Sequence, residues 1–324
     1  MRRFKLFCAF AAIALGSPAT AQEKQPVAAT EVLIGDQLTG AFFATPEGTG
    51  PFPAIILLGG SEGGDRTVRQ YAPRFLAEGY AVLGLPYYSP AYPGMEQEVP
   101  GLPRAFHDIP VNKLETARDW LRTQTAVGNQ PIGVYGVSKG AEFALLGASL
   151  IDGFAAVAAI VPSDVVWEGW GPGTTEGQSS SFSWRGKPIA FVPYYKMNEE
   201  IAKFGQPGAT PRLRTPQDEG RQRNPDKVEA ARIKVEEIEE PVLVAGGDLD
   251  DIWASGEMAQ YLSERRYAAG MPTVSLVFGE AGHALSGTGV QLTTGDYRYS
   301  EADLAAQRVI WPATLEFFAE HLKE

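Results

Sequence analysis

The chain has 324 residues, of which 44% are hydrophobic and 21% charged, which is typical of a globular protein with a large core rather than of a disordered one. Its net charge of −11 disfavours binding to nucleic acid or to anionic membranes, because both repel an acidic surface. The single cysteine, Cys8, lies near the N-terminus, and the three histidines are widely separated. Disulfides, thiol nucleophiles, metal sites and a bound cofactor are therefore not expected in the folded domain.

Residues 1–21 have the pattern of a secretory signal peptide. A basic start precedes an apolar run over residues 6–15, too short to cross a bilayer, and residues 19–21 (Ala-Thr-Ala) form a cleavage site. We expect cleavage after Ala21, a secreted or periplasmic protein, and no stable membrane insertion afterwards. An uncleaved anchor would need a longer apolar run. Cleavage would lower Lys plus Arg from 28 to 25 against 39 Asp plus Glu, for a net charge of −14.

Beyond the signal, residues 31–45 predict a hairpin with Gly35-Asp36 at its turn. Strands and helices then alternate. Strands are predicted at residues 53–58, 80–85, 131–135, 154–161, 241–245 and 273–278, and helices at 69–78, 112–122, 141–150 and 302–323. This order predicts an α/β fold with a doubly wound, mostly parallel sheet, and residues 22–324 as one domain.

A segment of about residues 163–232 interrupts the alternation. It is rich in Gly, Pro, Ser and Trp, then charged, and holds no clear strand. We interpret it as an insertion above the strand ends that acts as a lid or pocket wall; the alternative is a disordered surface excursion. Its aromatic residues predict an apolar acyl pocket with Trp167, Trp184 and Tyr194 as substrate-binding residues, unless they only pack the insertion onto the main domain. Its full aromatic set is Trp167, Trp170, Phe182, Trp184, Tyr194 and Tyr195.

The most informative motif is a G-x-S-x-G pattern centred on Ser138. An apolar run that predicts a strand precedes it, and an apolar run that predicts a helix follows it. A serine on such a sharp strand-to-helix turn has its hydroxyl exposed above the sheet edge, as a nucleophile requires. The alternative is a glycine-rich structural turn. We predict that Ser138 is a catalytic nucleophile.

A nucleophilic serine needs a general base, and in this architecture the base follows it in the chain. His107 precedes Ser138, and His321 lies in the predicted C-terminal helix. His283 lies in a glycine-flanked loop directly after the last predicted strand. His283 is therefore the predicted base.

The base needs an orienting carboxylate, and three aspartates crowd one loop after the strand at residues 241–245. Asp250 lies three residues past Gly247, a position that tends to face the histidine. Asp251 is the alternative, and Asp248 is expected to cap the turn.

Acyl transfer also needs two donors aimed at the tetrahedral oxyanion. One is the backbone N–H of Lys139. The other should come from the glycine-rich loop at residues 59–64, where Ser61 is our choice and Glu62 the alternative. Glu142 falls in the first turn of the helix, where the helix dipole favours a negative charge, and we expect a structural role for it.

Residues 136–142 (Gly-Val-Ser-Lys-Gly-Ala-Glu) resemble the elbow of the acyl-CoA thioesterase and bile acid-CoA:amino acid N-acyltransferase C-terminal domain family. Residues 59–64, 246–255 and 281–283 resemble the oxyanion, acid and histidine loops of that family, in order. The similarity extends from about residue 51 to residue 322. It implies an α/β-hydrolase fold and a triad of Ser138, Asp250 and His283.

The chain departs from that family in two ways. The amidating N-acyltransferases have cysteine where this chain has Ser138, which favours hydrolysis over transfer to an amino acid. The thioesterases carry an N-terminal β-sandwich domain, for which the sequence between Gln22 and Pro51 has no room, and the hairpin there resembles dienelactone-hydrolase-like esterases. We predict an exported serine hydrolase acting on a small-molecule acyl ester or thioester. A thioesterase or acyltransferase proper, a peptidase and a catalytically silent binding protein are the alternatives.

Overall fold

The computed structural model describes residues 30–323, except residues 34, 36–37, 92–95, 204–205, 207 and 293–297. The predicted signal peptide, and Asp36 of the predicted hairpin turn, lie outside the described residues. Within the described residues, no helix is both long and apolar enough to cross a membrane.

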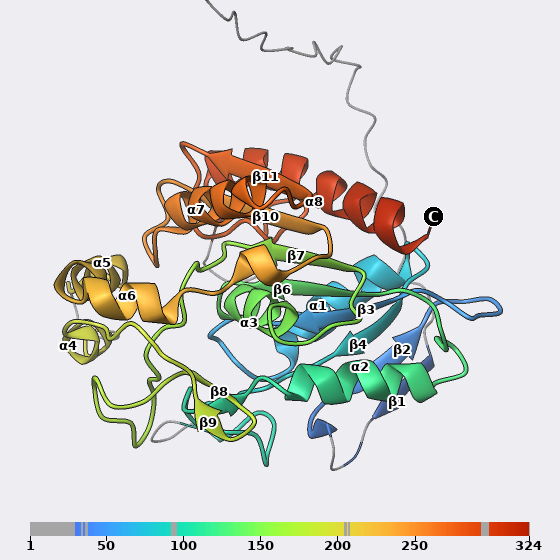
Figure 1. Cartoon of the computed structure of the whole chain (residues 1–324), viewed down its shortest axis with the longest axis horizontal. Helices are drawn as coiled ribbons and strands as arrows, with labels where there is room; N and C mark the ends of the chain where they lie inside the picture. The colour runs from blue at the N-terminus through green and yellow to red at the C-terminus, as the bar shows by residue number, and fades with distance from the viewer. Residues whose placement is uncertain are drawn as a thin grey trace, which may run out of the picture.

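Eight strands form one sheet in the order β1-β2-β4-β3-β6-β7-β10-β11 (Figure 1). Neighbours from β4 to β11 are parallel, and β1 and β2 add an antiparallel hairpin at one edge. The predicted hairpin and the predicted mostly parallel sheet are therefore confirmed. The strands are β1 (Thr30–Leu33), β2 (Phe42–Thr45), β3 (Ala54–Leu58), β4 (Ala81–Gly84), β6 (Ile132–Val137), β7 (Ala156–Ile160), β10 (Val242–Gly247) and β11 (Thr273–Phe278).

Helices cover both faces of the sheet (Figure 1), because the central strands are apolar on both sides. Helices α2, α3 and α7 pack on one face of the sheet, and α1 and α8 pack on the other. Each face has its own cluster of buried apolar residues. Their bounds are α1 (Arg66–Leu76), α2 (Lys113–Thr123), α3 (Lys139–Ala148), α7 (Ser255–Ala268) and α8 (Glu301–Leu322).

Helix α7 is the element of the main domain that the sequence analysis omitted. Its buried side includes Arg266, whose Nη1 donates to the carbonyls of Val235 and Ile238, each at 2.7 Å. A charged residue on the inner face interrupts the apolar spacing by which an amphipathic helix is recognised.

The segment between β7 and β10 folds beside the main domain, contrary to the expectation that it holds no clear strand. Strands β8 (Phe182–Trp184) and β9 (Lys187–Pro188) form a small sheet with β5 (Ile109–Pro110). These strands are too short to produce a recognisable alternation, and β5 belongs to a different part of the chain. The other elements are α4 (Met197–Ile201), α5 (Arg214–Arg223), α6 (Pro225–Ala231) and the 3-10 helix η2 (Val235–Glu237).

A buried ion pair joins the insertion to the main domain. Lys139 Nζ lies 2.7 Å from Glu142 Oε2, with side chains 3% and 0% exposed, and Glu142 Oε1 accepts the backbone N–H of Trp167 at 3.1 Å. The ammonium also lies over the rings of Phe106 and Phe182, at 5.7 and 5.3 Å from their centroids. Burial lowers the pKa of Lys139 and raises the pKa of Glu142, and the attraction between the two groups opposes both shifts.

Substitutions at this pair should affect stability non-additively. Glu142→Leu leaves the Lys139 ammonium buried without a carboxylate, so we expect the free energy of unfolding to fall by about 3–5 kcal/mol. The double variant Lys139→Met/Glu142→Leu buries no charge and should recover part of that loss. Urea denaturation of the three proteins provides the measurement.

A matched control exists at the surface. Lys234 and Glu237 have the same spacing, with side chains 65% and 54% exposed. Glu237→Leu should therefore cost less than about 1 kcal/mol. A double variant at the buried pair that is less stable than Glu142→Leu alone would contradict this account.

Candidate active site

Ser138 occupies the turn that joins β6 to α3. Its φ of 56° is a left-handed backbone angle that side-chain-bearing residues rarely adopt, and its N–H donates to Ile160 O at 2.9 Å. The turn closes because its flanking glycines permit close contact. A Cβ on Gly136 would lie 2.2 Å from Gly140 O, and a Cβ on Gly140 would lie 2.3 Å from Gly59 O. The predicted elbow is therefore present, with a strained serine at its apex.

Three polar side chains from three loops meet at this turn. Ser138 Oγ lies 3.0 Å from His283 Nε2, and His283 Nδ1 lies 2.7 Å from Asp250 Oδ2. The Ser138 residue is 8% exposed, the His283 side chain 23% and the Asp250 side chain 0%. This arrangement allows the serine hydroxyl to donate to Nε2 of a neutral imidazole, whose Nδ1–H donates to a buried carboxylate.

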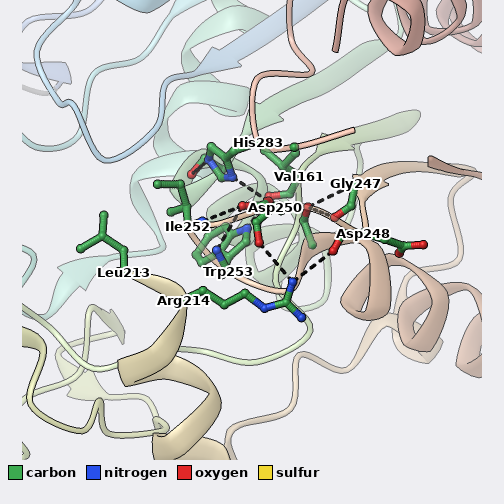
Figure 2. A network of polar contacts seen from close by, with 12 residues as sticks. Val161, Leu213, Arg214, Gly247, Asp248, Asp250, Ile252, Trp253 and His283 are labelled. Carbon is green, nitrogen blue, oxygen red and sulfur yellow. Dashed lines mark hydrogen bonds and ion pairs between the residues drawn. The ribbon is translucent and has the colours of Figure 1, made fainter. Parts of the chain in front are cut away.

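Of the three aspartates in the acid loop, Asp250 is buried, whereas Asp248 and Asp251 are exposed. Asp250 Oδ1 accepts the backbone N–H groups of Ile252 and Trp253, at 2.9 and 3.2 Å. Oδ2 accepts from His283 (Figure 2). It also accepts from Ser255 Oγ at 2.5 Å, so four donors converge on this carboxylate. The structure thus brings Asp250, and not the alternative Asp251, to the histidine.

The resemblance of residues 246–255 to the family's acid loop included Trp253 and Ser255, but neither of them was predicted to have a role at this carboxylate. Ser255 Oγ donates to Asp250, and Trp253 packs edge-on against the His283 ring, with the ring centroids 6.0 Å apart. The indole N–H of Trp253 donates to Val161 O at 3.2 Å, which fixes the ring beside the histidine. Their proximity to Asp250 in the chain was the available signal.

The two proposed oxyanion donors lie at the same place. Lys139 is the first residue of α3, where a backbone N–H has no acceptor within the helix, and both Lys139 and Ser61 line the cavity at Ser138. The side chain of Glu62, the alternative donor residue, accepts the N–H of Gly60 at 3.0 Å. Glu62 thus supports the loop, and Ser61 faces the site.

A cavity of about 460 Å³ opens beside Ser138. The insertion and the acid loop form walls that are mostly apolar, and Gln217 is the main polar side chain in them. The wall residues are Trp170, Tyr194, Met197, Ile201, Leu213, Gln217, Ile252 and Trp253. The volume lies within the range of about 300–1,000 Å³ that is typical of small-molecule sites.

Tyr194 lines the cavity, but the other two residues expected to bind substrate do not. Trp167 is fully buried behind Tyr194, with the two rings stacked at 5.4 Å. Trp184 lies in β8 of the small sheet, and Cζ of Arg185 lies over its ring, 4.9 Å from the ring centroid. Both tryptophans therefore pack the insertion, as the alternative interpretation of the aromatic cluster held, and Trp170 takes the position at the wall.

This chain matches two protein-family models and resembles several known proteins. The family model described as BAAT / Acyl-CoA thioester hydrolase C terminal matches residues 109–287, and the dienelactone hydrolase family model matches residues 39–171. Acyl-coenzyme A thioesterase 1 of Rattus norvegicus is 27% identical over 76% of this chain and 52% of its own length. Acyl-coenzyme A amino acid N-acyltransferase 2 of the same organism is 27% identical over 88% of this chain and 64% of its own.

The chain thus spans about half the length of the thioesterase that it matches. Among solved structures, MGS-M1, an alpha/beta hydrolase enzyme from a Medee basin deep-sea metagenome library, superposes with a TM-score of 0.54 at 16% identity, covering 93% of this chain and 100% of that one. That likeness supports the α/β-hydrolase fold. With a family model matching more than half of its residues, the chain belongs to the BAAT / acyl-CoA thioester hydrolase C-terminal family.

Proposed function

We propose that this protein is an exported serine hydrolase that cleaves a carboxylic ester or an acyl thioester through an acyl-enzyme. One observation carries the proposal: the hydrogen-bonded chain from Ser138 Oγ through His283 to the buried Asp250, at 3.0 and 2.7 Å, opens onto an apolar cavity. A nucleophile, a base and an orienting carboxylate in this order constitute the apparatus of acyl transfer.

In the first half-reaction, Ser138 Oγ attacks the acyl carbon while His283 Nε2 takes the hydroxyl proton. Asp250 accepts a hydrogen bond from Nδ1–H and stabilises the imidazolium that forms. His283 then gives its proton to the leaving alcohol or thiol. This leaves the acyl group esterified to Ser138.

The negative charge on the acyl oxygen needs donors that are in place before the reaction. The backbone N–H groups of Lys139 and Ser61 supply them, and the N-terminus of α3 adds a favourable dipole. In the second half-reaction, His283 deprotonates a water molecule, which attacks the acyl carbon of the acyl-enzyme. The bond between the acyl carbon and Ser138 Oγ then breaks, His283 returns its proton to Oγ, and the carboxylic acid is released.

The substrate class follows from the cavity. Its apolar walls suit an acyl chain, because burying each methylene contributes about 0.8 kcal/mol. The relatives named acyl-coenzyme A thioesterases support a thioester, and the match to the dienelactone hydrolase model supports an ester. Serine at the nucleophile position favours water over an amino acid as the acceptor.

The first experiment measures hydrolysis of p-nitrophenyl acyl esters and of acyl-CoA thioesters by the wild type and Ser138→Ala. We expect Ser138→Ala to lose at least about a thousandfold in kcat, because the nucleophile is absent. Ser149→Ala, at the other end of α3, should keep the wild-type rate. A Ser138→Ala variant with full activity would exclude the mechanism.

The products of that experiment decide between the alternatives. Ester turnover without acyl-CoA turnover identifies an esterase, and efficient acyl-CoA cleavage identifies a thioesterase. New amides formed in the presence of amine acceptors would indicate acyl transfer. Failure to label Ser138 with a fluorophosphonate, together with no turnover, would indicate a binding protein.

The cavity wall predicts acyl-chain selectivity. Ile201→Trp should shorten the cavity and lower kcat/KM for octanoyl more than for acetyl p-nitrophenyl ester, by about fourfold for each methylene excluded. Trp184→Leu is the control, because Trp184 lies outside the cavity wall. An octanoyl-to-acetyl ratio that responds to Trp184→Leu and not to Ile201→Trp would contradict this assignment of the wall.

The proposal that the protein is exported rests on the signal-peptide pattern of residues 1–21, and a separate experiment tests it. Expression of the full chain in a Gram-negative host should yield periplasmic protein whose mature N-terminus, read by mass spectrometry, is Gln22. Replacing Arg2, Arg3 and Lys5 by glutamate should retain the precursor in the cytoplasm. An intact N-terminus in the periplasmic fraction would contradict cleavage after Ala21.

A further inference from the structure

The loop that carries Asp250 is held from outside by helix α5 of the insertion. Nη1 of Arg214 donates to Asp248 O at 3.2 Å and to Asp250 O at 3.1 Å (Figure 2). The backbone N–H of Arg214 donates to Asp251 O at 3.1 Å, and Gln217 Nε2 donates to Ile252 O at 2.7 Å. One turn of α5 thus satisfies four backbone carbonyls of the acid loop.

The same loop holds the carboxylate from within. Its N–H groups at Ile252 and Trp253 donate to Asp250 Oδ1, while its carbonyls accept from α5. A displacement of the loop would therefore move the carboxylate and its inner donors together, away from His283.

Arg214 is itself fixed in orientation. Its Nε lies 3.2 Å from Asp218 Oδ2, and its Nη2 lies 3.1 Å from Glu257 Oε1 on α7. Its side chain is 27% exposed. The planar guanidinium uses separate nitrogens for the two carbonyls and the two carboxylates, which the single ammonium of a lysine does not reproduce.

We propose that Arg214 and Gln217 are positioning residues for the reaction, acting through Asp250. The inference rests on the proposed hydrolase function. It extends that function, because α5 also contributes Gln217 to the cavity wall, with Leu213 directly before it. Helix α5 then links the cavity wall, which contacts the acyl group, to Asp250, which orients the base. A displacement of α5 would therefore leave His283 without its orienting carboxylate.

A double-variant cycle tests this inference. The measured quantities are the second-order rate of fluorophosphonate labelling at Ser138 and kcat and KM for p-nitrophenyl acetate, in wild type, Arg214→Ala, Asp250→Asn and the double variant. Arg214→Ala should lower the labelling rate and kcat by about 10- to 100-fold, since small displacements of a catalytic group cost that much. KM for the short acetyl ester should change less than about threefold, because Arg214 does not line the cavity.

The decisive comparison is the Asp250→Asn background. If Arg214 acts through Asp250, Arg214→Ala should change the rates less than about threefold there, because the interaction it supports has been removed. Equal losses in both backgrounds, or a wild-type rate in Arg214→Ala, would overturn the inference. Arg223→Ala is the matched control on the same helix, where the arginine pairs with Glu219 and makes no contact with the acid loop; it should stay within twofold of wild type.

Two further variants keep the test possible if Arg214→Ala does not fold. Arg214→Lys keeps the charge and should give an intermediate loss, and Gln217→Met removes the donors to Ile252 O at similar volume and should lower kcat about tenfold. Either takes the place of Arg214→Ala in the cycle. Wild-type activity or labelling in Ser138→Ala would instead overturn the hydrolase proposal itself, so the two failures remain distinguishable.

Discussion

Much of this site depends on one close contact, the packing of the β6–α3 turn against β3. Gly140 allows it, since a Cβ there would lie 2.3 Å from Gly59 O, directly after β3. Gly136 allows the turn itself to close, since a Cβ there would lie 2.2 Å from Gly140 O. The turn forces Ser138 to a φ of 56° and lifts its hydroxyl out of the sheet edge. It also aims the first N–H groups of α3 at the same point. The proposed nucleophile and the proposed oxyanion donor are therefore both positioned by one backbone geometry.

Charged side chains join the insertion to the active-site elements of the main domain at two places. The buried Lys139–Glu142 pair ties the start of α3 to the backbone of Trp167, and Arg214 ties α5 to the loop of Asp250. Both ties replace water around polar backbone with fixed partners inside the protein. This is why a segment rich in Gly and Pro, whose helices and strands are mostly short, forms a defined wall over Ser138.

The polar and apolar parts of the site are separated in a way that suits acyl transfer. The hydrogen-bonded chain of polar groups runs from Ser138 through the partly exposed His283 to a fully buried carboxylate, whereas the cavity walls are mainly aromatic and aliphatic. In the proposed mechanism, a buried carboxylate with four donors keeps its position while the imidazole gains and loses a proton. The acyl group is the part of an ester or thioester substrate that suits an apolar wall.

Residues close together in the chain carried the information that the sequence alone determined. The apolar runs predicted the order of strands and helices along the chain, and the G-V-S-K-G-A-E stretch identified the elbow. Chain order and spacing led to His283 and Asp250, and the structure places His283 within hydrogen-bonding distance of both Ser138 and Asp250. Only the tertiary structure decided that Trp167 and Trp184 pack away from the cavity, that β8 and β9 pair with β5, and that Arg214 reaches the acid loop. Local patterns specify strands, turns and caps, because those depend on neighbouring residues. Which side chain of an irregular segment faces a cavity depends on contacts between residues tens of positions apart, and no local pattern encodes them.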